Sequence, residues 1–484
     1  MIDFMAQRRP GGRMSRNASF LSLVATLLLG ALPARAVYLD AEGTGQILIY
    51  PYYTVQASGA DAYNTLLSVA NATGDSKVIK VRFREGLNGR QVFDINVYLG
   101  GGDIWTAAVI PDAGGGARIV SRDASCTNPP LPEAGQAFVS SSYSGANDDG
   151  LGTGAGRARE GYFEMIEMAT LPAGLTQDAT GKRNCTAVKL NPAPLESLGG
   201  PSGGLHGNAT LININTGLDV SYAATALASV SSRVMYGDPG SAQPDFDSPA
   251  IDPVASIVVD NVAYRLVMAN GLDAIGAVLA AGATENEYVL DATTASKTDW
   301  VETHPLRRLR IPGAPTFSNG GCLDPYFTVY DREQDSWFAG TGFDPEPPNG
   351  YEICWAATVF AIRNDPTNGS ATSDVLASVN TLTQPATLPR LALNPAVQTP
   401  FANGGMVWPQ PIFTSLVSTT ASTATNLATG TATTGKFLVA GQPVVGFVAR
   451  TFVNANVTCG NVLCQATYSA ALPHRRIRSI SPAS

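Results

Sequence analysis

The segment VFDINVYL, residues 92–99, decides the fold class of this chain. Its side chains alternate between two faces. One face carries Val92, Asp94, Asn96 and Tyr98, and the opposite face carries Phe93, Ile95, Val97 and Leu99. A period of two is that of a β-strand. The turn pair Asn88-Gly89 precedes the segment and Gly100-Gly101-Gly102 follows it. A strand bounded by two turns is therefore predicted.

Further strand-like segments lie on both sides of this one, with turns between them. They are residues 46–55, 65–70, 78–83 and 103–110. Pro51 interrupts the first of them, which fits an edge strand or a bulge. Short strands with turns at a spacing of about ten residues are typical of an antiparallel sandwich. We therefore predict an all-β chain of antiparallel, immunoglobulin-like β-sandwiches with long loops.

Changes in composition indicate where the domains lie. Residues 111–205 are rich in Gly, Pro and Asp and contain one strand-like segment, 161–169, so they are interpreted as a loop-rich insertion. The proline-rich passage 310–315 is the expected domain boundary. We therefore predict an N-terminal β-sandwich over residues 37–310 and a smaller C-terminal one over residues 311–484.

The first 36 residues have the layout of a secretory signal peptide. A basic start precedes an apolar run, residues 20–32, and Ala34-Arg35-Ala36 supplies the small residues of a cleavage site. The apolar run is too short to span a bilayer comfortably. We expect the signal to begin at Met1 or Met14 and to be removed after residue 36. The mature protein would then be secreted, periplasmic or on the cell surface.

The composition narrows the class of partner. Charged residues make up 14 % of the chain, against roughly 25 % in a typical soluble domain. Residues 1–36 contain five Arg and one Asp, so the rest of the chain has 26 basic and 38 acidic residues and a net charge of about −12. This charge disfavours binding to nucleic acid or to an anionic membrane surface. No later apolar run is long enough for a transmembrane segment.

The six cysteines are expected to form disulfides, because an even number in an exported chain favours that state. They are Cys126, Cys185, Cys322, Cys354, Cys459 and Cys464. Every connectivity remains open, but proximity in the sequence favours Cys126–Cys185, Cys322–Cys354 and Cys459–Cys464. A zinc site is disfavoured because no two cysteines have the C-x-x-C spacing.

Two patterns could indicate catalysis, and neither has the right context. Residues 200–204 read GPSGG, with Ser202 at the centre and His206 two residues further on. A nucleophile elbow needs a strand before the serine and a helix after it, whereas a strand-like segment follows here. Glu164 and Glu167 are three residues apart on a predicted strand, which places them on opposite faces. They are interpreted as edge or surface charges rather than as a glycosidase pair, so no catalytic residue is assigned.

Metal binding is considered at two acidic loops, which could hold calcium through carboxylate oxygens. They are residues 147–150, and the group Asp238, Asp245, Asp247 and Asp252. Neither has the spacing of a known calcium loop, so solvated turn residues remain the alternative. The three histidines are too scattered to predict a zinc site; they are His206, His304 and His474. We expect no cofactor, with structural calcium left open.

Two sets of strand residues could face a ligand. The aromatic set could line a sugar-binding or peptide-binding face, and it comprises Tyr50, Tyr52, Tyr53, Tyr98 and Trp105. Aromatic residues in strands are more often core residues, which is the alternative. The basic set is interpreted as a solvated strand face, and it comprises Lys80, Arg82, Arg84 and Arg90.

Several blocks of the sequence resemble a group of exported β-rich proteins of Gram-negative bacteria. The blocks are GTGQILIYPYYTV (43–55), KVRFREGLNGR (80–90), DINVYL (94–99), GYFEMIEM (161–168), TDWV (298–301) and GQPVVGF (441–447). The chain departs from the group at Gly100-Gly101-Gly102, where Ser-Pro is expected, and at His304, where Phe is expected. The resemblance implies a secreted β-protein and no particular chemistry.

These observations favour a secreted or cell-surface protein without catalysis. Its role would be structural, adhesive or interactive, with envelope or matrix components or further copies of itself as partners. The alternative is an extracellular carbohydrate-binding protein or hydrolase, which predicts an aromatic-lined cleft or a catalytic cluster around Ser202.

Overall fold

The computed structural model of the chain divides into two units between Arg35 and Ala36. It describes residues 35–59, 62–172, 185, 197–289, 294–310, 327–331, 336–339, 353–363, 372–381, 390–392, 403–409, 416–460 and 462–484. Residues 1–34, which hold most of the expected signal peptide, lie outside the described residues. The second unit comprises Ala36–Ser484.

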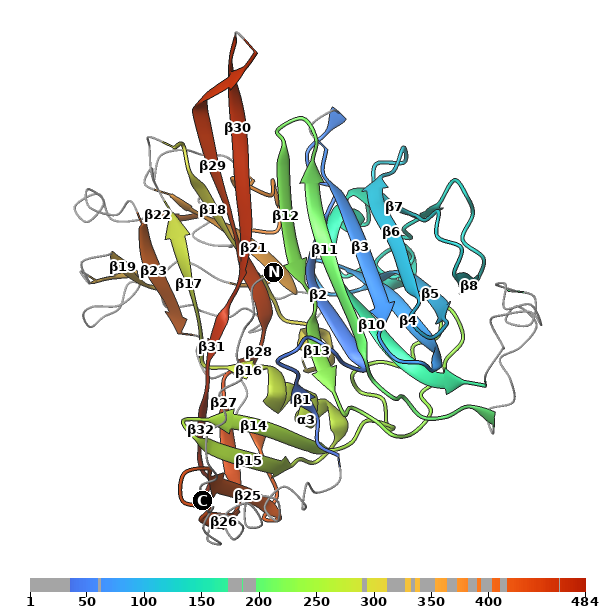
Figure 1. Ribbon diagram of the computed structural model, residues 1–484, viewed down its shortest axis with the longest axis vertical. Coiled ribbons are helices and arrows are strands. Elements are labelled where there is room, and N and C mark those ends of the chain that lie inside the picture. Colours follow the sequence, from blue (N-terminus) through green and yellow to red (C-terminus); the bar gives the residue numbers. More distant parts are fainter. Residues whose placement is uncertain are drawn as a thin grey trace, which may run out of the picture. The chain divides into compact units, whose positions relative to one another are not determined.

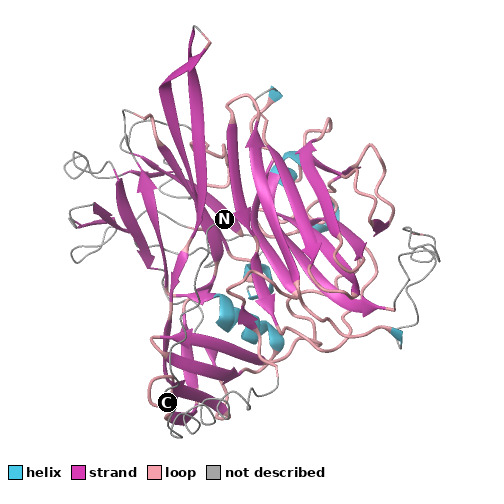
Figure 2. Ribbon diagram, viewed as in Figure 1, coloured by secondary structure: helices cyan, strands magenta, loops and turns pink. Residues whose placement is uncertain are grey.

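Antiparallel strands make up most of the second unit, which confirms the predicted all-β class (Figure 2). The largest sheet has seven strands and includes the segment that the sequence singles out, as β5. In order across the sheet these strands are β1 (Tyr38–Leu39), β13 (Thr225–Ala228), β2 (Ile47–Thr54), β10 (Glu160–Leu171), β4 (Ser76–Glu85), β5 (Gln91–Leu99) and β8 (Cys126–Asn128).

A six-stranded sheet shares a hydrophobic core with the seven-stranded sheet. In order its strands are β12 (Leu218–Ala223), β11 (Leu205–Asn213), β3 (Asn64–Asn71), β6 (Ile104–Pro111), β7 (Ala117–Val120) and β9 (Gln136–Ala137) (Figure 1). With seven and six strands, the two sheets are larger than those of an immunoglobulin domain, which has seven to nine strands in all. The immunoglobulin-like part of the expectation therefore lacks support.

Alternation explains how the core between the two sheets is filled. Ile79, Val81 and Phe83 of β4 point into it, and so do Val69 of β3 and Trp105 of β6. Aromatic rings stack within it, with 4.1 Å between the centroids of Tyr50 and Phe163 and 4.5 Å between those of Phe83 and Phe163. Each sheet consequently has one face in this core and one face turned away from it.

The remaining sheets combine strands from both halves of the chain. One contains β14 (Val254–Val259), β15 (Val262–Val267), β25 (Ser422–Asn426) and β26 (Ala432–Gly435). A second contains β20 (Ser336–Ala339), β19 (Phe327–Asp331), β23 (Asn403–Pro409), β17 (Ala283–Val289) and β31 (Arg475–Ile477). A third contains β22 (Arg390–Ala392), β21 (Ala357–Arg363), β18 (Lys297–Thr303), β29 (Val445–Cys459) and β30 (Val462–Pro473). The smallest are β24 (Leu416–Val417) with β27 (Phe437–Ala440) and β32 (Ser479–Pro482), and β16 (Ala280–Ala281) with β28 (Gln442–Pro443).

The boundary expected near residue 310 does not divide the strands into two sets. Strand β15 pairs with β25, and β18 pairs with β21 and β29, across that position. Glu160 of β10 also accepts hydrogen bonds from the backbone N–H groups of Val379 (2.9 Å) and Asn380 (3.2 Å). Proline-rich composition marks a loop, whereas strand pairing depends on contacts between distant segments that local composition does not reveal. Residues 36–484 are one compact unit.

Short helices complete the described part of the chain. They include α3 (Gly271–Leu279), which begins at the N-cap Asn270, and α4 (Arg307–Arg310). Among the described residues, every helix is too short or too polar to cross a membrane.

A disulfide joins Cys126 on β8 to Cys185, the pair that sequence proximity favours, with Cα atoms 5.2 Å apart. Cys354 is also disulfide-bonded, while its favoured partner Cys322 lies outside the described residues. Cys459 and Cys464 lie near the turn between β29 and β30, and their side chains lie outside the description.

Candidate functional site

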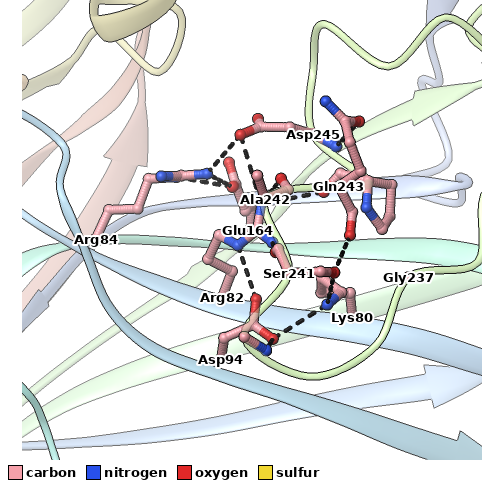
Figure 3. Close-up of polar contacts among 12 residues, drawn as sticks. Lys80, Arg82, Arg84, Asp94, Glu164, Gly237, Ser241, Ala242, Gln243 and Asp245 are labelled. Carbon is pink, nitrogen blue, oxygen red and sulfur yellow. Dashed lines mark hydrogen bonds and ion pairs between the residues drawn. The ribbon is translucent and has the colours of Figure 1, made fainter. Parts of the chain in front are cut away.

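The face of the seven-stranded sheet that points away from the core carries buried cations. Strand β4 alternates, so Lys80, Arg82 and Arg84 project opposite to its core residues (Figure 3). Their exposed fractions are 0 %, 1 % and 3 %. The expectation of a solvated basic face is therefore wrong for these three residues. The expectation is confirmed for Arg90, because 44 % of its side chain is exposed.

Carboxylates surround these cations on every side. Asp94 contacts Lys80 at 3.1 Å and Arg82 at 2.9 Å. Glu164 contacts Arg84 at 2.6 Å. Asp245 lies 3.0 Å from Arg84 and 3.4 Å from Arg82, and it also pairs with Arg308. Because charges this deeply buried are stable only when paired, the network explains how the sheet tolerates them.

A loop that we call the cover segment, residues 237–245, closes over this face (Figure 3). Lys80 Nζ donates a hydrogen bond to the carbonyl oxygen of Asp238 at 2.7 Å. The guanidinium of Arg82 donates to three further carbonyl oxygens, those of Ser241, Ala242 and Pro244. The cations thus use their remaining hydrogens to hold the cover segment, and this cluster is a structural clamp.

Two groups of the clamp, Asp245 and Lys80, have pKa values shifted by their surroundings. Burial alone would raise the pKa of Asp245, but the positive charges of Arg84, Arg308 and Arg82 outweigh it and hold that pKa below its ordinary value. Burial lowers the pKa of Lys80, and the negative charge of Asp94 opposes the shift. The three arginines therefore favour the deprotonated form of Asp245.

The two glutamates of β10 occupy opposite faces of the strand, as their spacing indicates. Glu164 lies across from Arg82 on the clamp side, and Glu167 lies across from the core residue Ile79. Both have an exposed fraction of 0 %, so their interpretation as edge or surface charges is wrong. Each is instead buried against a cation, Arg84 for Glu164 and Lys77 for Glu167.

Ser202 lies in the loop between β10 and β11, above the buried pair Lys77–Glu167. Lys77 Nζ donates to the hydroxyl of Ser202, to Glu167 at 2.7 Å and to the carbonyl oxygen of Gly203 at 2.7 Å. These three contacts link the side chain of Lys77 to Glu167 and to the loop that carries Ser202. Glu167 also accepts the N–H groups of Ser202 and Gly203, both at 2.8 Å. Ser202 Oγ itself lies 3.5 Å from Glu167 Oε1. The arrangement anchors the loop to the buried pair.

The three histidines do not come together in the structure. His206 is exposed on β11, opposite Ala70 of β3. His304 is buried and His474 is half-buried, and removal from water lowers the pKa of each to about 3. His474 stacks on Trp300 with 4.3 Å between the ring centroids. No group of three or more potential metal ligands is found within the described residues.

Two of the carboxylates considered for calcium, those of Asp149 and Asp245, contact arginine. Both oxygens of Asp149 lie 2.6 Å from the guanidinium of Arg157, and Asn88 donates to one of them. Asp245 belongs to the clamp. A guanidinium therefore occupies the position that a cation would take beside each of these two carboxylates.

The aromatic candidates are core residues in this structure. Tyr52, Tyr53, Tyr98 and Trp105 are each at most 1 % exposed. The hydroxyl of Tyr52 donates to Glu160 at 2.6 Å, and the ring of Tyr53 packs on Phe83. These side chains fill space between and behind the sheets and do not form an exposed ligand face. This agrees with the alternative interpretation, that aromatic residues in strands are core residues.

The outward face of the six-stranded sheet differs, because it is open and hollowed. A cavity of about 680 Å³ lies across β11, β3, β6 and β7. Pairing registers define two rows of side chains that cross the strands. The first, the polar row, is Asn208, Ser68 and Thr106. The second, the mixed row, is Thr210, Leu66, Ala108 and Val120.

This open face presents side chains rather than backbone groups. Strands β11 and β3 each pair with a neighbour on both sides. At Thr106 of β6, where β7 no longer runs alongside, the backbone N–H donates to Asp123 instead. The exposed fraction of Leu66 is 42 %, which is high for a large aliphatic residue. Sequence alternation alone could not identify this face, because it gives no sign of which face of a strand stays open.

Comparison of the chain with protein-family models, with curated proteins and with solved structures finds no significant match. The function is therefore inferred from the geometry of the two outward faces.

Proposed function

We propose that this chain is an exported, non-catalytic binding protein that contacts its partner through the open face of the six-stranded sheet. The observation that carries the proposal is the hollow of about 680 Å³ on that face. A volume in this range is typical of binding pockets. The partner would be a component of the cell envelope or of the extracellular matrix.

Three features support the export of the protein. The first 36 residues have the layout of a signal peptide. The Cys126–Cys185 disulfide is compatible with an oxidising compartment outside the cytoplasm. The resemblance to exported β-rich proteins of Gram-negative bacteria favours the same location. A secreted, periplasmic or cell-surface protein accounts for all three features.

The role of the buried charges supports a function without catalysis. The clamp holds the cover segment, and Lys77 with Glu167 anchors the loop of Ser202. The two charged groups beside Ser202 are both bonded to its loop, Lys77 to the hydroxyl of Ser202 and Glu167 to the backbone N–H groups of Ser202 and Gly203. Binding through the open face requires neither group.

Retention of the mature protein on washed cell envelopes tests the proposal. Leu66→Glu places a charge in the hollow, and Val258→Glu is the matched control on β14, where Val258 is 57 % exposed. We expect the unaltered protein and Val258→Glu to sediment with the envelopes and Leu66→Glu to remain in the supernatant. Equal sedimentation of the two variants, or no sedimentation of the unaltered protein, would contradict the proposal.

A further inference from the structure

We propose that the hollow of the open face binds a neutral glycan chain, laid along the polar row Asn208, Ser68 and Thr106. This inference rests on the proposed function and names the class of ligand. It depends on the hydrogen-bonding groups in the hollow, on their spacing, on the adjoining apolar surface and on the charge of the face.

Two members of the polar row, Asn208 and Ser68, offer side-chain groups that can bond to a ligand, while the hydroxyl of Thr106 donates to Asp123 at 3.4 Å. Asn208 and Ser68 lie directly opposite each other on adjacent strands. Neither the amide of Asn208 nor the hydroxyl of Ser68 forms a hydrogen bond with another of the described residues. An amide has two donor hydrogens and an acceptor oxygen, and a hydroxyl both donates and accepts. Such groups match the hydroxyls of a sugar, which also donate and accept.

The spacing of the polar row suits a chain of sugar rings. Its members lie on adjacent strands, β11, β3 and β6, and adjacent strands are about 4.8 Å apart. A pyranose ring in an extended glycan covers about that length, so successive sugars can meet successive side chains. An extended polypeptide repeats its side-chain direction only every two residues, or about 6.7 Å, and does not match the row.

The mixed row supplies the apolar side of the site. Leu66 and Ala108 lie opposite each other, and Val120 lies opposite Ala108 on β7. These aliphatic groups form a row parallel to the polar row, two residues away along each strand. A sugar ring has C–H faces and polar edges, so it can cover the mixed row while its hydroxyls bond to the polar row.

The charge on the face favours a neutral ligand. Neither row contains a charged side chain. Arg122 and Glu133, both exposed, line the same hollow with opposite charges, and they offer no net attraction to a polyanion. The acidic character of the whole chain also opposes binding of an anionic glycan.

The open face is also a poor site for the commonest mode of peptide binding. Peptides that bind to sheets usually add a strand at an edge, where backbone groups are free. Strands β11 and β3 have partners on both sides, and Asp123 accepts the N–H of Thr106. A peptide in the hollow would meet side chains only, whereas a glycan requires nothing more.

The test is calorimetric titration of the mature protein with four neutral hexasaccharides, derived from cellulose, starch, mannan and chitin. Heparin and a tryptic digest of casein are the polyanionic and peptide probes. The variant Ser68→Trp fills the hollow, and Asn208→Ala removes the amide. The matched control is Thr434→Trp on β26, because Thr434 is exposed and far along the chain from the open face. Circular dichroism confirms that each variant folds.

We expect at least one neutral hexasaccharide to bind and Thr434→Trp to leave its affinity unchanged. Asn208→Ala should weaken binding by about tenfold, because sugar hydroxyls then lose a partner, and Ser68→Trp should abolish it. The inference is overturned if no neutral hexasaccharide binds, if only heparin or the casein peptides bind, or if Ser68→Trp binds as well as the unaltered protein. When Leu66 is needed for retention on envelopes but no sugar binds, the glycan inference fails and the proposed function stands.

Discussion

The two outward faces of the paired sheets differ in whether their polar side chains are buried and paired or open to solvent. On the seven-stranded sheet, the cations Lys80, Arg82 and Arg84 are buried beneath the cover segment and bonded to it. On the six-stranded sheet, the polar row is uncharged and open to solvent over a wide hollow. The charged residues that stand out in the sequence are therefore structural, and the small neutral residues that do not stand out line the hollow that we propose as the binding site.

The energetics of burial explain this difference. Moving an ion out of water costs several kcal/mol, and only a fixed partner offsets that cost. In the clamp the partners are fixed by the fold, so the ions cannot also serve an exchangeable ligand. The polar row bears no such cost, because Asn208 and Ser68 are uncharged and remain accessible to solvent.

The largest expected effect comes from breaking the covered face. Asp245→Asn removes the carboxylate that Arg82, Arg84 and Arg308 share. Removing one partner of a buried ion pair destabilises a protein by about 3–5 kcal/mol, because the other charge stays buried. Chemical denaturation measures this loss in the free energy of unfolding. Asp247→Asn is the control two residues away, where an exposed carboxylate should matter by less than about 0.5 kcal/mol.

A second prediction concerns the pH dependence of the covered face. The pKa of Asp245 is held below its ordinary value of 3.8, so its contribution to stability is complete above that value and is lost as the pH falls through the folded-state pKa. The difference in unfolding free energy between the unaltered protein and Asp245→Asn should therefore shrink when the pH is lowered from about 7 to about 3. A difference that stays constant over this range would show that the carboxylate acts only through its shape.

Glu167 should affect the pH dependence of stability in the opposite direction to Asp245, so the two variants can be compared directly. Burial raises the pKa of Glu167 above its ordinary value of 4.5, and the opposing charge of Lys77 does not cancel the shift. Its ionised form is therefore a cost to the folded state that acidification relieves. The free energy of unfolding of Glu167→Gln, measured by chemical denaturation, should therefore increase relative to that of the unaltered protein as the pH rises from about 4 to about 7. The same slope in both profiles would contradict this assignment.

The smallest expected effect on stability is on the open face. Ser68→Ala removes a hydroxyl that bonds to none of the described residues, so the free energy of unfolding should change by less than about 0.5 kcal/mol. Thermal denaturation is the measurement. A loss as large as that of Asp245→Asn would mean that the open face is as structural as the covered one.

Local pattern in the sequence predicted the strands but not their surroundings. The alternation in residues 92–99 and the turns beside it correspond to β5 and its flanking loops. The same alternation placed Lys80, Arg82 and Arg84 on one face of β4 correctly. It could not show that this face is buried, since the cover segment lies more than 150 residues later, with Asp238 158 residues beyond Lys80. Long-range contacts of this kind leave no periodic signal.

The surroundings of the candidate site residues also depend on long-range contacts that local sequence pattern does not reveal. Ser202 has the right neighbours for a nucleophile motif, yet its setting depends on Lys77, which is 125 residues away. The aromatic residues of the strands are core because two sheets close over them. The polar row consists of common residue types from strands far apart in the chain, so only the pairing registers bring it together.

The most direct test of the central claim compares Asp245→Asn with Ser68→Trp in two assays, the free energy of unfolding and retention on washed envelopes, at a temperature where both variants are folded. The account predicts that Asp245→Asn loses stability and keeps binding, while Ser68→Trp keeps stability and loses binding. If Ser68→Trp is retained as well as the unaltered protein, or if Asp245→Asn alone abolishes retention while folded, the open face is not the binding surface.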